Sequence, residues 1–277
     1  MRILHLFLLF HLAIVSAKAT DIQIIPYPQS LTKTTGTCDL SLGYNLKGDR
    51  QNQDYLNDLL TSDFALSTNA KGITIELVIK RKPGENNEAY HLTISPKKIR
   101  IEAPAQNGIF YAIQTLRQLI KNKQIPCLTI YDKPTFPWRC SMLDEARYFQ
   151  GKETVKQLLD EMALLKLNKF HWHLTNDAGW RIEIKKYPLL TQIGSVRDST
   201  QINDNGKKWN SEIFDGKVHK GYYTQEDIKE IVSYAQKRHI TIIPEISMPG
   251  HASAIAVAYP ELMSAPGPYA MERHWGV

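Results

Sequence analysis

The chain has 277 residues, of which 43% are hydrophobic and 22% are charged, and its formal net charge is +6 at pH 7. This mild basic excess is spread along the chain without a block of five like charges, so it does not indicate a nucleic-acid-binding protein. The length from Thr20 onward is enough for one small domain and part of a second one.

The first nineteen residues predict a cleavable secretory signal. They combine the basic Arg2, an apolar run over 3–15 and small residues at Ala17 and Ala19, in the order that is typical of such segments. The run is shorter than the roughly 20 apolar residues that a membrane-spanning helix needs, and no later segment is long and apolar enough to span a membrane. We therefore expect residues 1–19 to be removed on export, which leaves a periplasmic or extracellular protein without a membrane span.

Residues 20–133 predict a small α+β domain. The apolar stretch 73–79 is followed by two β-rich runs over 90–94 and 99–102, joined by a plausible hairpin connection. A helix is predicted over 108–120, because its apolar residues recur with the period of a helix that packs on a sheet. These residues are Ile109, Ala112, Ile113, Leu116, Leu119 and Ile120.

Three cysteines follow the predicted cleavage site, at Cys38, Cys127 and Cys140. Because the number is odd, at least one stays free or pairs between chains. Their long and irregular spacing resembles no zinc site. A single disulfide could form in an oxidising compartment, and the sequence leaves its pairing open.

From residue 134, after a connection that contains two prolines, strands and helices alternate. The order is strand, helix, strand, helix, strand, with these elements predicted over 141–143, 153–166, 169–175, from Thr224, and over 240–246. Asp227 follows Thr224 by three residues, which is a capping-box arrangement. The alternation implies parallel strands with right-handed crossovers, and it fits either an open doubly wound sheet or a (β/α) barrel.

Polar side chains fall at or just beyond the carboxyl ends of the three predicted strands. They are Arg147, Asn176, Asp177, Glu245, Ser247 and His251. Barrel enzymes assemble their active sites at this face, and the set suits a polyhydroxyl ligand. Arg147 has two interpretations that its spacing does not separate: a fork-like contact with two neighbouring hydroxyls, and an ion pair with Asp144.

His171 and His173 lie on one face of a predicted strand, because strand side chains alternate with period two. Barrel metallohydrolases use the same spacing to bind zinc, so a metal-dependent barrel hydrolase is an alternative function. Further ligands are not evident in the sequence, and we predict neither a metal nor another cofactor.

Three segments, 142–149, 170–181 and 244–251, carry the motifs Asp-x-x-Arg-x-Phe, His-x-His-Leu and Pro-Glu-Ile-x-Met-Pro-Gly-His. Together they resemble the substrate-binding strand ends of family 20 glycoside hydrolases, the β-N-acetylhexosaminidases. The Gly-x-x-Tyr-x-x-Gln-Thr-Leu helix over 108–116 resembles the small amino-terminal domain of that family. The resemblance implies an α/β fold in which the α+β domain is followed, over 134–277, by the first three strands of a (β/α)8 TIM barrel that is incomplete here.

The resemblance further implies hydrolysis of terminal, non-reducing N-acetylglucosamine or N-acetylgalactosamine from a β-linked glycan substrate, with retention. In such enzymes the acetamido oxygen of the substrate attacks the anomeric carbon. An aspartate holds the acetamide, and the neighbouring glutamate protonates the leaving oxygen. Both acids belong to the next barrel strand of the family, so we assign no catalytic residue within these 277 residues and expect this piece alone to be inactive. A non-catalytic glycan-binding protein is the second hypothesis.

Individual residues also receive roles from the resemblance. Arg147 matches the arginine that grips the ring hydroxyls of the terminal sugar, and we expect Asp177 and Glu245 beside it. Asn176 stands where the family has an acid that hydrogen-bonds the histidine matching His251, which supports the catalytic glutamate. Because an amide brings no negative charge, we expect weaker tuning of the general acid. Asp177 would replace it only if the strand ended one residue early.

The roles of Trp180 and Ser247 do not follow directly from the resemblance. Trp180 would either stack on a sugar ring, as part of the substrate-binding set, or pack beneath the strand-end loop, which is the interpretation that we favour because aromatic residues bury large areas. Ser247 occupies a place that is usually acidic in the family, so it puts full catalytic efficiency in doubt.

Overall fold

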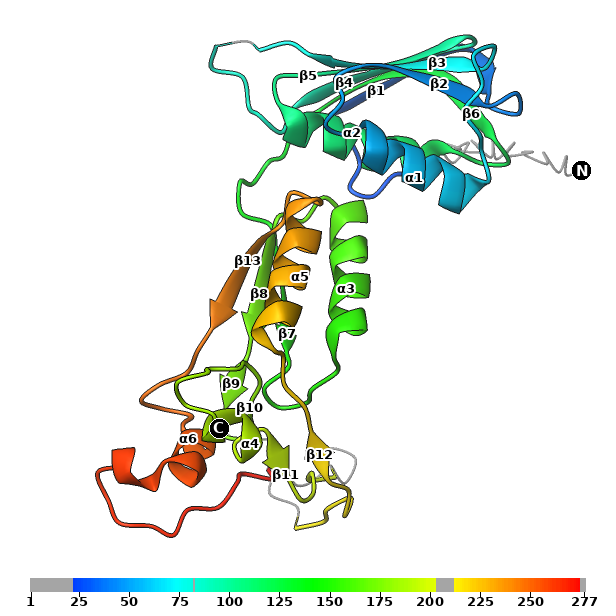
Figure 1. The fold of residues 1–277 in the computed structure, drawn as a ribbon. Coiled ribbons are helices and arrows are strands. Elements are labelled where there is room, and N and C mark those ends of the chain that lie inside the picture. The colour runs from blue at the N-terminus through cyan, green and yellow to red at the C-terminus, as the bar shows by residue number, and fades with distance from the viewer. Residues whose placement is uncertain (1–21, 82, 203–211, 275–277) are drawn as a thin grey trace, which may run out of the picture.

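Two units lie end to end along an elongated molecule (Figure 1). The computed structural model describes residues 22–81, 83–202 and 212–274. The predicted signal over 1–19 lies outside these residues. Within the described parts of the chain, no helix is long and apolar enough to span a membrane.

The first unit is a six-stranded mixed sheet with the strand order β1-β6-β4-β5-β3-β2. Two helices, α1 (Gln53–Phe64) and α2 (Gln106–Leu119), lie together on one face of it (Figure 1). The predicted hairpin is present as β4 and β5, and the predicted helix as α2. The strands are β1 (Ser30–Asp39), β2 (Tyr44–Gly48), β3 (Ile73–Ile79), β4 (Tyr90–Ser95), β5 (Lys98–Ala103) and β6 (Gln124–Asp132).

Helix α2 forms the centre of this unit because ten of its 14 residues are buried. Ile109, Ile113 and Leu116 have at most 1% of their surface exposed, as the apolar stripe in the sequence predicts. A Cβ atom at Gly108 would lie 2.2 Å from the carbonyl oxygen of Ala89, so only glycine allows the helix to start this close to the sheet.

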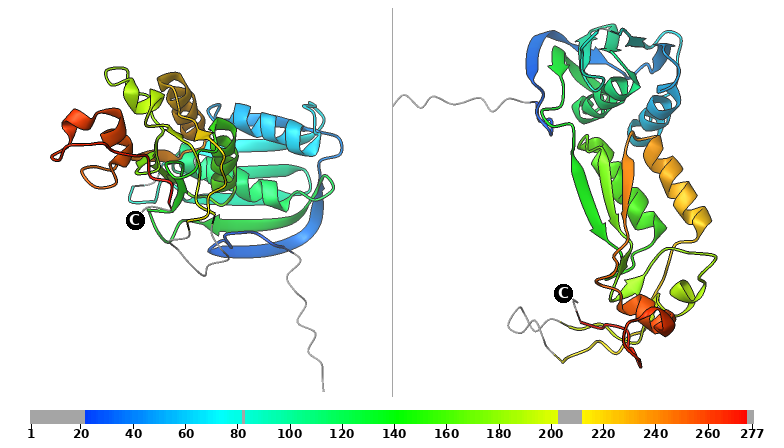
Figure 2. Two further views of the ribbon diagram at one scale, coloured as in Figure 1. Left: turned by 90° about the horizontal axis from the view of Figure 1, so that it is seen from below. Right: turned by 90° about the vertical axis from the view of Figure 1, so that its left-hand side faces the viewer.

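The second unit contains three parallel strands, β7 (Cys140–Asp144), β8 (Lys169–His173) and β13 (Thr241–Glu245), in the order β13-β8-β7. Helices α3 (Lys152–Leu164) and α5 (Gln225–Gln236) cover one face of the strands (Figure 2). The alternation of strand and helix is as predicted. Thr224 and Asp227 form the predicted capping box at the start of α5.

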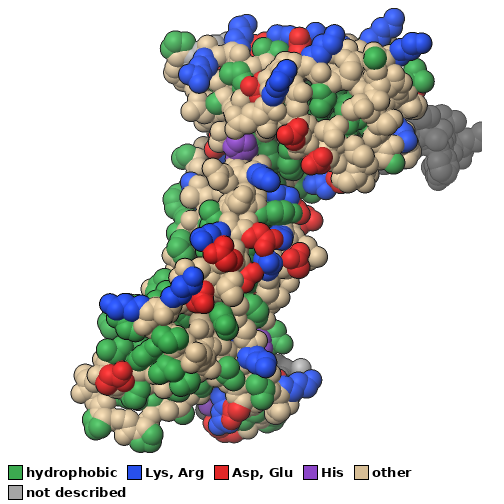
Figure 3. All heavy atoms as spheres, viewed as in Figure 1, with side chains coloured by type: hydrophobic (Ala, Val, Ile, Leu, Met, Phe, Trp, Pro, Cys, Tyr) green, Lys and Arg blue, Asp and Glu red, His purple; other side chains and the backbone are tan. Residues whose placement is uncertain are grey.

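The burial of β8 explains why this central strand is so apolar on one side. Phe170 and Trp172 are at most 1% exposed, whereas His171 and His173 project from the opposite face. On the outer surface, charged side chains of both signs gather over α3 and α5 (Figure 3), where Lys152 and Lys156 both contact Glu230.

A buried ion pair joins the two units. Lys166 Nζ, just before β8, lies 2.8 Å from Asp132 Oδ2 at the end of β6 and 2.9 Å from the hydroxyl of Tyr90. Burial lowers the pKa of Lys166, and the charge of Asp132 opposes this shift. Because a buried charge without its partner is costly, this contact favours one arrangement of the units.

Most of the remaining short elements lie beyond the carboxyl ends of the three strands (Figure 1). They are β9 (Thr175–Asn176), β10 (Gly179–Trp180), α4 (Leu189–Gln192), β11 (Val196–Arg197), β12 (His219–Lys220), α6 (Ser253–Ala258) and the 3₁₀ helix η1 (Pro260–Leu262). The three cysteines are all free, with Cys38 and Cys127 buried and Cys140 exposed, so none of the disulfides that the sequence left open is formed.

Candidate functional site

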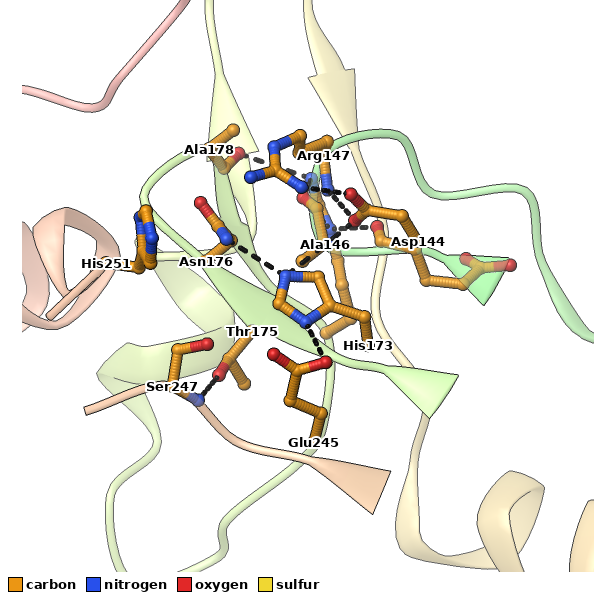
Figure 4. Close-up of polar contacts among 12 residues, drawn as sticks. Asp144, Ala146, Arg147, His173, Thr175, Asn176, Ala178, Glu245, Ser247 and His251 are labelled. Atoms are coloured by element: carbon orange, nitrogen blue, oxygen red, sulfur yellow. Dashed lines mark hydrogen bonds and ion pairs between the residues drawn. The ribbon is translucent and has the colours of Figure 1, made fainter. Parts of the chain in front are cut away.

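The final residues of the three parallel strands form one row of polar side chains (Figure 4). In the strand register, Asp144 is paired with His173, and His173 is paired with Glu245. Because paired residues in a sheet project to the same face, all three side chains point away from the covering helices. The carboxyl end of the sheet therefore carries an acid, an imidazole and a second acid side by side.

Glu245 bridges the two histidines of β8. Its Oε2 atom lies 2.6 Å from His171 Nε2 and 2.8 Å from His173 Nδ1. Burial raises the pKa of Glu245, but the contacts with His173 and then His171 outweigh it and lower the pKa overall. The prediction that both histidines share a face is confirmed. In the described residues, no group of three or more His, Cys, Asp or Glu side chains has a geometry that could hold a metal ion.

Asn176 fixes the protonation pattern of His173. The amide oxygen of Asn176 accepts a hydrogen bond of 2.7 Å from the backbone N–H of Asp177, so its NH2 group faces His173 Nε2 at 2.9 Å. An amide NH2 only donates, and His173 Nε2 therefore accepts. This leaves the ring proton to His173 Nδ1, which lies 2.8 Å from Glu245 Oε2 without a hydrogen bond of normal geometry.

The predicted pairing of Asn176 with His251 is wrong, because Asp177 takes this role. Asp177 Oδ2 lies 2.8 Å from His251 Nδ1, and Oδ1 accepts hydrogen bonds from the backbone N–H and the hydroxyl of Ser253, at 3.0 and 2.7 Å. The physical reason is that β9 ends at Asn176 and turns directly into β10, so Asp177 does not continue the strand alternation. The imidazole of His251 thus has a carboxylate partner after all.

The same contacts determine the charge state and the role of Asp177. Burial raises its pKa, but the hydrogen bonds from Ser253 and the contact with His251 are stronger and lower it overall. Both of its oxygens are engaged by protein groups, and only 14% of the side chain is exposed. The geometry therefore gives Asp177 a positioning role in place of the predicted direct contact with a sugar.

Arg147 follows β7 and is held by the acid at the end of that strand. Its backbone N–H donates to Asp144 Oδ1 at 3.0 Å, and its guanidinium forms an ion pair with Asp144 Oδ2. The ion pair that the sequence offered as one interpretation is present, and 32% of the Arg147 side chain remains exposed. A carboxylate that orients a guanidinium is compatible with ligand contact, so the predicted grip on sugar hydroxyls stays a prediction.

Arg181 organises the loops around this site, and no pattern in the sequence predicted this role. The side chain is fully buried, and its guanidinium donates only to backbone carbonyl oxygens. Burial and the nearby Arg197 lower its pKa to about 10, which leaves it cationic at neutral pH. The acceptors, at 2.7–3.3 Å, belong to Glu145, Ala146, Ala178, Ser195 and Gly221.

This arrangement connects the loop of Arg147 to the loop of Asp177, since residues 145–146 precede Arg147 and Ala178 follows Asp177. A Cβ atom at Gly179 would lie 2.2 Å from the Arg181 guanidinium, so a glycine is needed for the loop to pass it. Arginine is mostly found at surfaces, so the residue type does not predict burial. The one signal in the sequence is the position of Arg181 inside the motif over 170–181.

Trp180 packs inside the protein, so its assignment to the substrate-binding set is wrong and the favoured packing interpretation holds. The side chain is 4% exposed and belongs to a small apolar cluster with Leu190, Ala254 and Ala258. Its Nε1–H donates to the carbonyl oxygen of Ile182 at 2.6 Å. The ring therefore supports the base of the strand-end loops and is not available for stacking on a ligand.

A neutral histidine anchors the end of the Arg147 loop. His219 Nε2 accepts a hydrogen bond of 2.8 Å from the backbone N–H of Phe149. Burial and then the charges of Arg197 and Arg181 lower the pKa of His219 to about 4, so the ring keeps the lone pair that it needs. The exposed Tyr148 lies over this histidine, with ring centroids 4.2 Å apart.

Ser247 lies on the segment that follows β13. Its backbone N–H donates to the hydroxyl of Thr175 at 2.8 Å (Figure 4). This contact ties the segment after β13 to the start of β9. The local backbone is therefore anchored although a serine, and not an acidic residue, stands at position 247.

Comparison with known proteins relates this arrangement to one family. The model for the catalytic domain of glycosyl hydrolase family 20 matches residues 136–276, and the model for domain 2 of the same family matches residues 21–133. Beta-hexosaminidase from Porphyromonas gingivalis is 34% identical over 92% of this chain and 34% of its own length. Beta-hexosaminidase from Vibrio furnissii is 36% identical over 90% of this chain and 41% of its own length. The chain thus spans between a third and two fifths of these two curated relatives.

Solved structures agree with the sequence matches. The exo β-N-acetylglucosaminidase from Vibrio harveyi, crystallised in complex with N-acetylglucosamine, has a TM-score of 0.74 and 34% identity, over 91% of this chain and 41% of that structure. The N-acetyl-β-hexosaminidase from Streptomyces plicatus has a TM-score of 0.75 and 33% identity, over 90% of this chain and 50% of that structure.

Proposed function

The chain belongs to glycosyl hydrolase family 20, and on this premise we propose that the whole protein is a β-N-acetylhexosaminidase. It would release terminal, non-reducing N-acetylglucosamine or N-acetylgalactosamine from β-linked glycans. The observation that carries the proposal is the gathering of Arg147, Glu245 and the Asp177–His251 pair at the carboxyl ends of three parallel strands. The activity is proposed for the whole protein because the chain spans only part of its relatives.

We also propose that β7, β8 and β13 are the first three strands of a (β/α)8 barrel. The strands are parallel and in register, and the helices cover only one face. The other face carries His171, His173 and Glu245 at one end. This is the face that would line a barrel interior, whose carboxyl end holds the active site in enzymes of this fold.

In the proposed mechanism, the residues of this chain bind and orient the sugar ring, while the attacking group belongs to the substrate itself. Arg147, oriented by Asp144, would hold two ring hydroxyls through its fork of donors. With the ring correctly held, the acetamido oxygen of the substrate attacks the anomeric carbon, and the configuration is retained after hydrolysis. The aspartate that holds the acetamide and the glutamate that acts as the acid would come from the next strand of the barrel.

His251 would support that glutamate. Asp177 accepts from His251 Nδ1, which leaves Nε2 as the nitrogen that can meet a further group. The negative charge that Asn176 does not bring to His251 is therefore supplied by the neighbouring residue, Asp177.

We also propose that the protein is exported through the segment over 1–19 and meets its glycan outside the cytoplasm.

The test is turnover of a chromogenic N-acetyl-β-glucosaminide by the intact native protein, with the anomeric form of the first product followed by NMR. Release of the β-anomer first is the expected result. Binding of N-acetylglucosamine without any turnover would contradict the enzymatic proposal and favour a glycan-binding protein. Loss of activity on chelation would instead favour a metal-dependent hydrolase. Measuring the intact mass of the native protein beforehand establishes which chain is being assayed.

A further inference from the structure

A small cavity of about 230 Å³ lies at the junction of the two units. Arg139 and Lys166 line it, and these residues precede β7 and β8. The cavity is therefore at the amino ends of the strands, whereas the candidate functional site is at their carboxyl ends. Its other walls come from the segment before β1, with Tyr27 and Gln29, from the connection between the units, with Asp132 and Phe136, and from Tyr90 and Tyr111 of the small unit.

The floor of the cavity is polar and buried. Tyr90 is 1% exposed, Lys166 5% and Asp132 8%, and the Lys166 ammonium is held by the other two. Tyr111 is 2% exposed, and its hydroxyl makes no hydrogen bond of normal geometry to a described residue. Buried polar groups almost always have a partner, and the Tyr111 hydroxyl, whose contact with Arg139 is weak, has room for a hydrogen bond with a group that enters the cavity.

The charges of the cavity select against an ionic ligand. Lys166 lies 2.8 Å from Asp132, and Arg139 lies 2.7 Å from Glu88, so the two cations and the two anions compensate each other. An anion would meet two carboxylates and a cation would meet two basic groups. The lining nevertheless offers both donors and acceptors, and a hydroxyl group can use both because it donates and accepts.

The rim of the cavity is aromatic. Tyr27 and Phe136 keep 59% and 69% of their surface exposed, although both line the opening. Gln29 fixes the two rim segments side by side, since its Nε2 donates to the carbonyl oxygen of Lys133 and to the hydroxyl of Thr135, both at 3.4 Å. Polar groups on the floor and aromatic side chains at the rim are the features of a site for a ligand with one polar edge and one apolar face.

We propose that this cavity is a second carbohydrate-binding site, which takes one neutral sugar ring with its hydroxyls on the buried floor and its C–H face against Tyr27 and Phe136. The volume is below the roughly 300–1,000 Å³ of pockets for drug-sized ligands, so a monosaccharide unit is the largest ligand that it encloses. The inference stands on the lining residues alone and does not require the activity proposed above.

The experiment is a titration of the intact native protein with N-acetylglucosamine, by calorimetry, in three variants. Arg147→Ala removes binding at the candidate functional site, and Tyr27→Ala/Phe136→Ala removes the aromatic rim at exposed positions. We expect the rim variant to weaken one of two binding events about tenfold, from two lost aromatic contacts. Leu42→Ala, at another exposed apolar position of the same unit (71% exposed), is the control and should leave both events unchanged.

Tyr111→Phe separates a binding role from a folding role. Because the hydroxyl makes no hydrogen bond of normal geometry to a described residue, its removal should change the melting temperature little while it weakens sugar binding severalfold. A single binding event that Arg147→Ala abolishes would overturn the proposal. So would rim variants that bind as the native protein does, or a cavity that takes up inorganic phosphate in preference to the sugar.

Discussion

His251 Nδ1 lies 2.8 Å from Asp177 Oδ2, although 74 positions separate the two residues in the sequence. The start of α6 completes the contact, because Ser253 binds the other oxygen of the same carboxylate. The loop after β8 and the loop after β13 are thereby fastened to each other beside the candidate functional site. Asp177 thus determines where His251, which follows β13, is held.

Asp177→Asn keeps the size of this side chain and removes its charge. We expect kcat of the intact protein on a chromogenic N-acetyl-β-glucosaminide to fall about tenfold with KM nearly unchanged, since both carboxylate oxygens of Asp177 are engaged by protein groups. Ser253→Ala is the matched control, because it spares the contact with His251. Equal losses in the two variants would show that the loop connection, and not the charge, matters.

Arg147→Lys keeps the positive charge and removes the fork. A point charge on a flexible stem cannot replace a planar, two-pronged donor, so kcat/KM is expected to fall about 100-fold, which corresponds to roughly 2.7 kcal/mol. Steady-state kinetics of the intact protein measure this. Arg81→Lys, at an exposed position of the small unit, should have no effect. A fully active Arg147→Lys enzyme would contradict the proposed grip on the sugar.

Arg181→Leu should destabilise the protein strongly. It removes the donors of several buried carbonyl groups at once, and each unsatisfied buried group costs about 1–3 kcal/mol, so a loss of about 3–5 kcal/mol or failure to fold is expected. Urea unfolding of the intact protein gives the value. Arg181→Lys tests the geometry, since an ammonium offers three donors and should recover only part of the loss.

Lys166→Met tests the ion pair between the two units. The change leaves Asp132 buried without its cation, so the free energy of unfolding should fall by about 3–5 kcal/mol. The double variant Lys166→Met/Asp132→Leu should recover most of this loss, because it buries no charge. A double variant as unstable as the single one would mean that hydrogen bonds to Tyr90, and not charge pairing, hold the junction.

Acid sensitivity should depend in part on His219. Its pKa is about 4 in the folded protein and about 6.5 when unfolded, so between these values the unfolded chain binds the proton and the folded chain does not. Stability is therefore full above about pH 6.5 and declines as the pH falls toward 4. His219→Gln keeps an acceptor for Phe149 and does not titrate. Its unfolding free energy should change less between pH 6.5 and 4, and an identical slope would contradict this account.

The sequence predicted what depends on periodicity. The apolar stripe of α2, the capping box at Thr224 and the shared face of His171 and His173 all follow from residue spacing, because helix and strand geometry repeat regularly. The order of strands and helices in the second unit was predictable for the same reason.

The sequence did not predict what depends on a single residue at the end of an element. Whether Asn176 or Asp177 meets His251 is decided by the point at which β9 stops, and strand ends cannot be located to one residue from propensity. The burial of Arg181 was missed because its partners are backbone carbonyls from distant segments, which leave no pattern of side chains in the sequence.

The contacts of Arg181 also determine which positions of these loops can be substituted. Its guanidinium binds main-chain oxygens only, so the anchor depends on the path of the loops and not on which side chains they carry. Exposed positions in these loops can then be exchanged while the anchor stays in place. Selection experiments that randomise such positions should yield folded variants far more often than those that alter Arg181 itself.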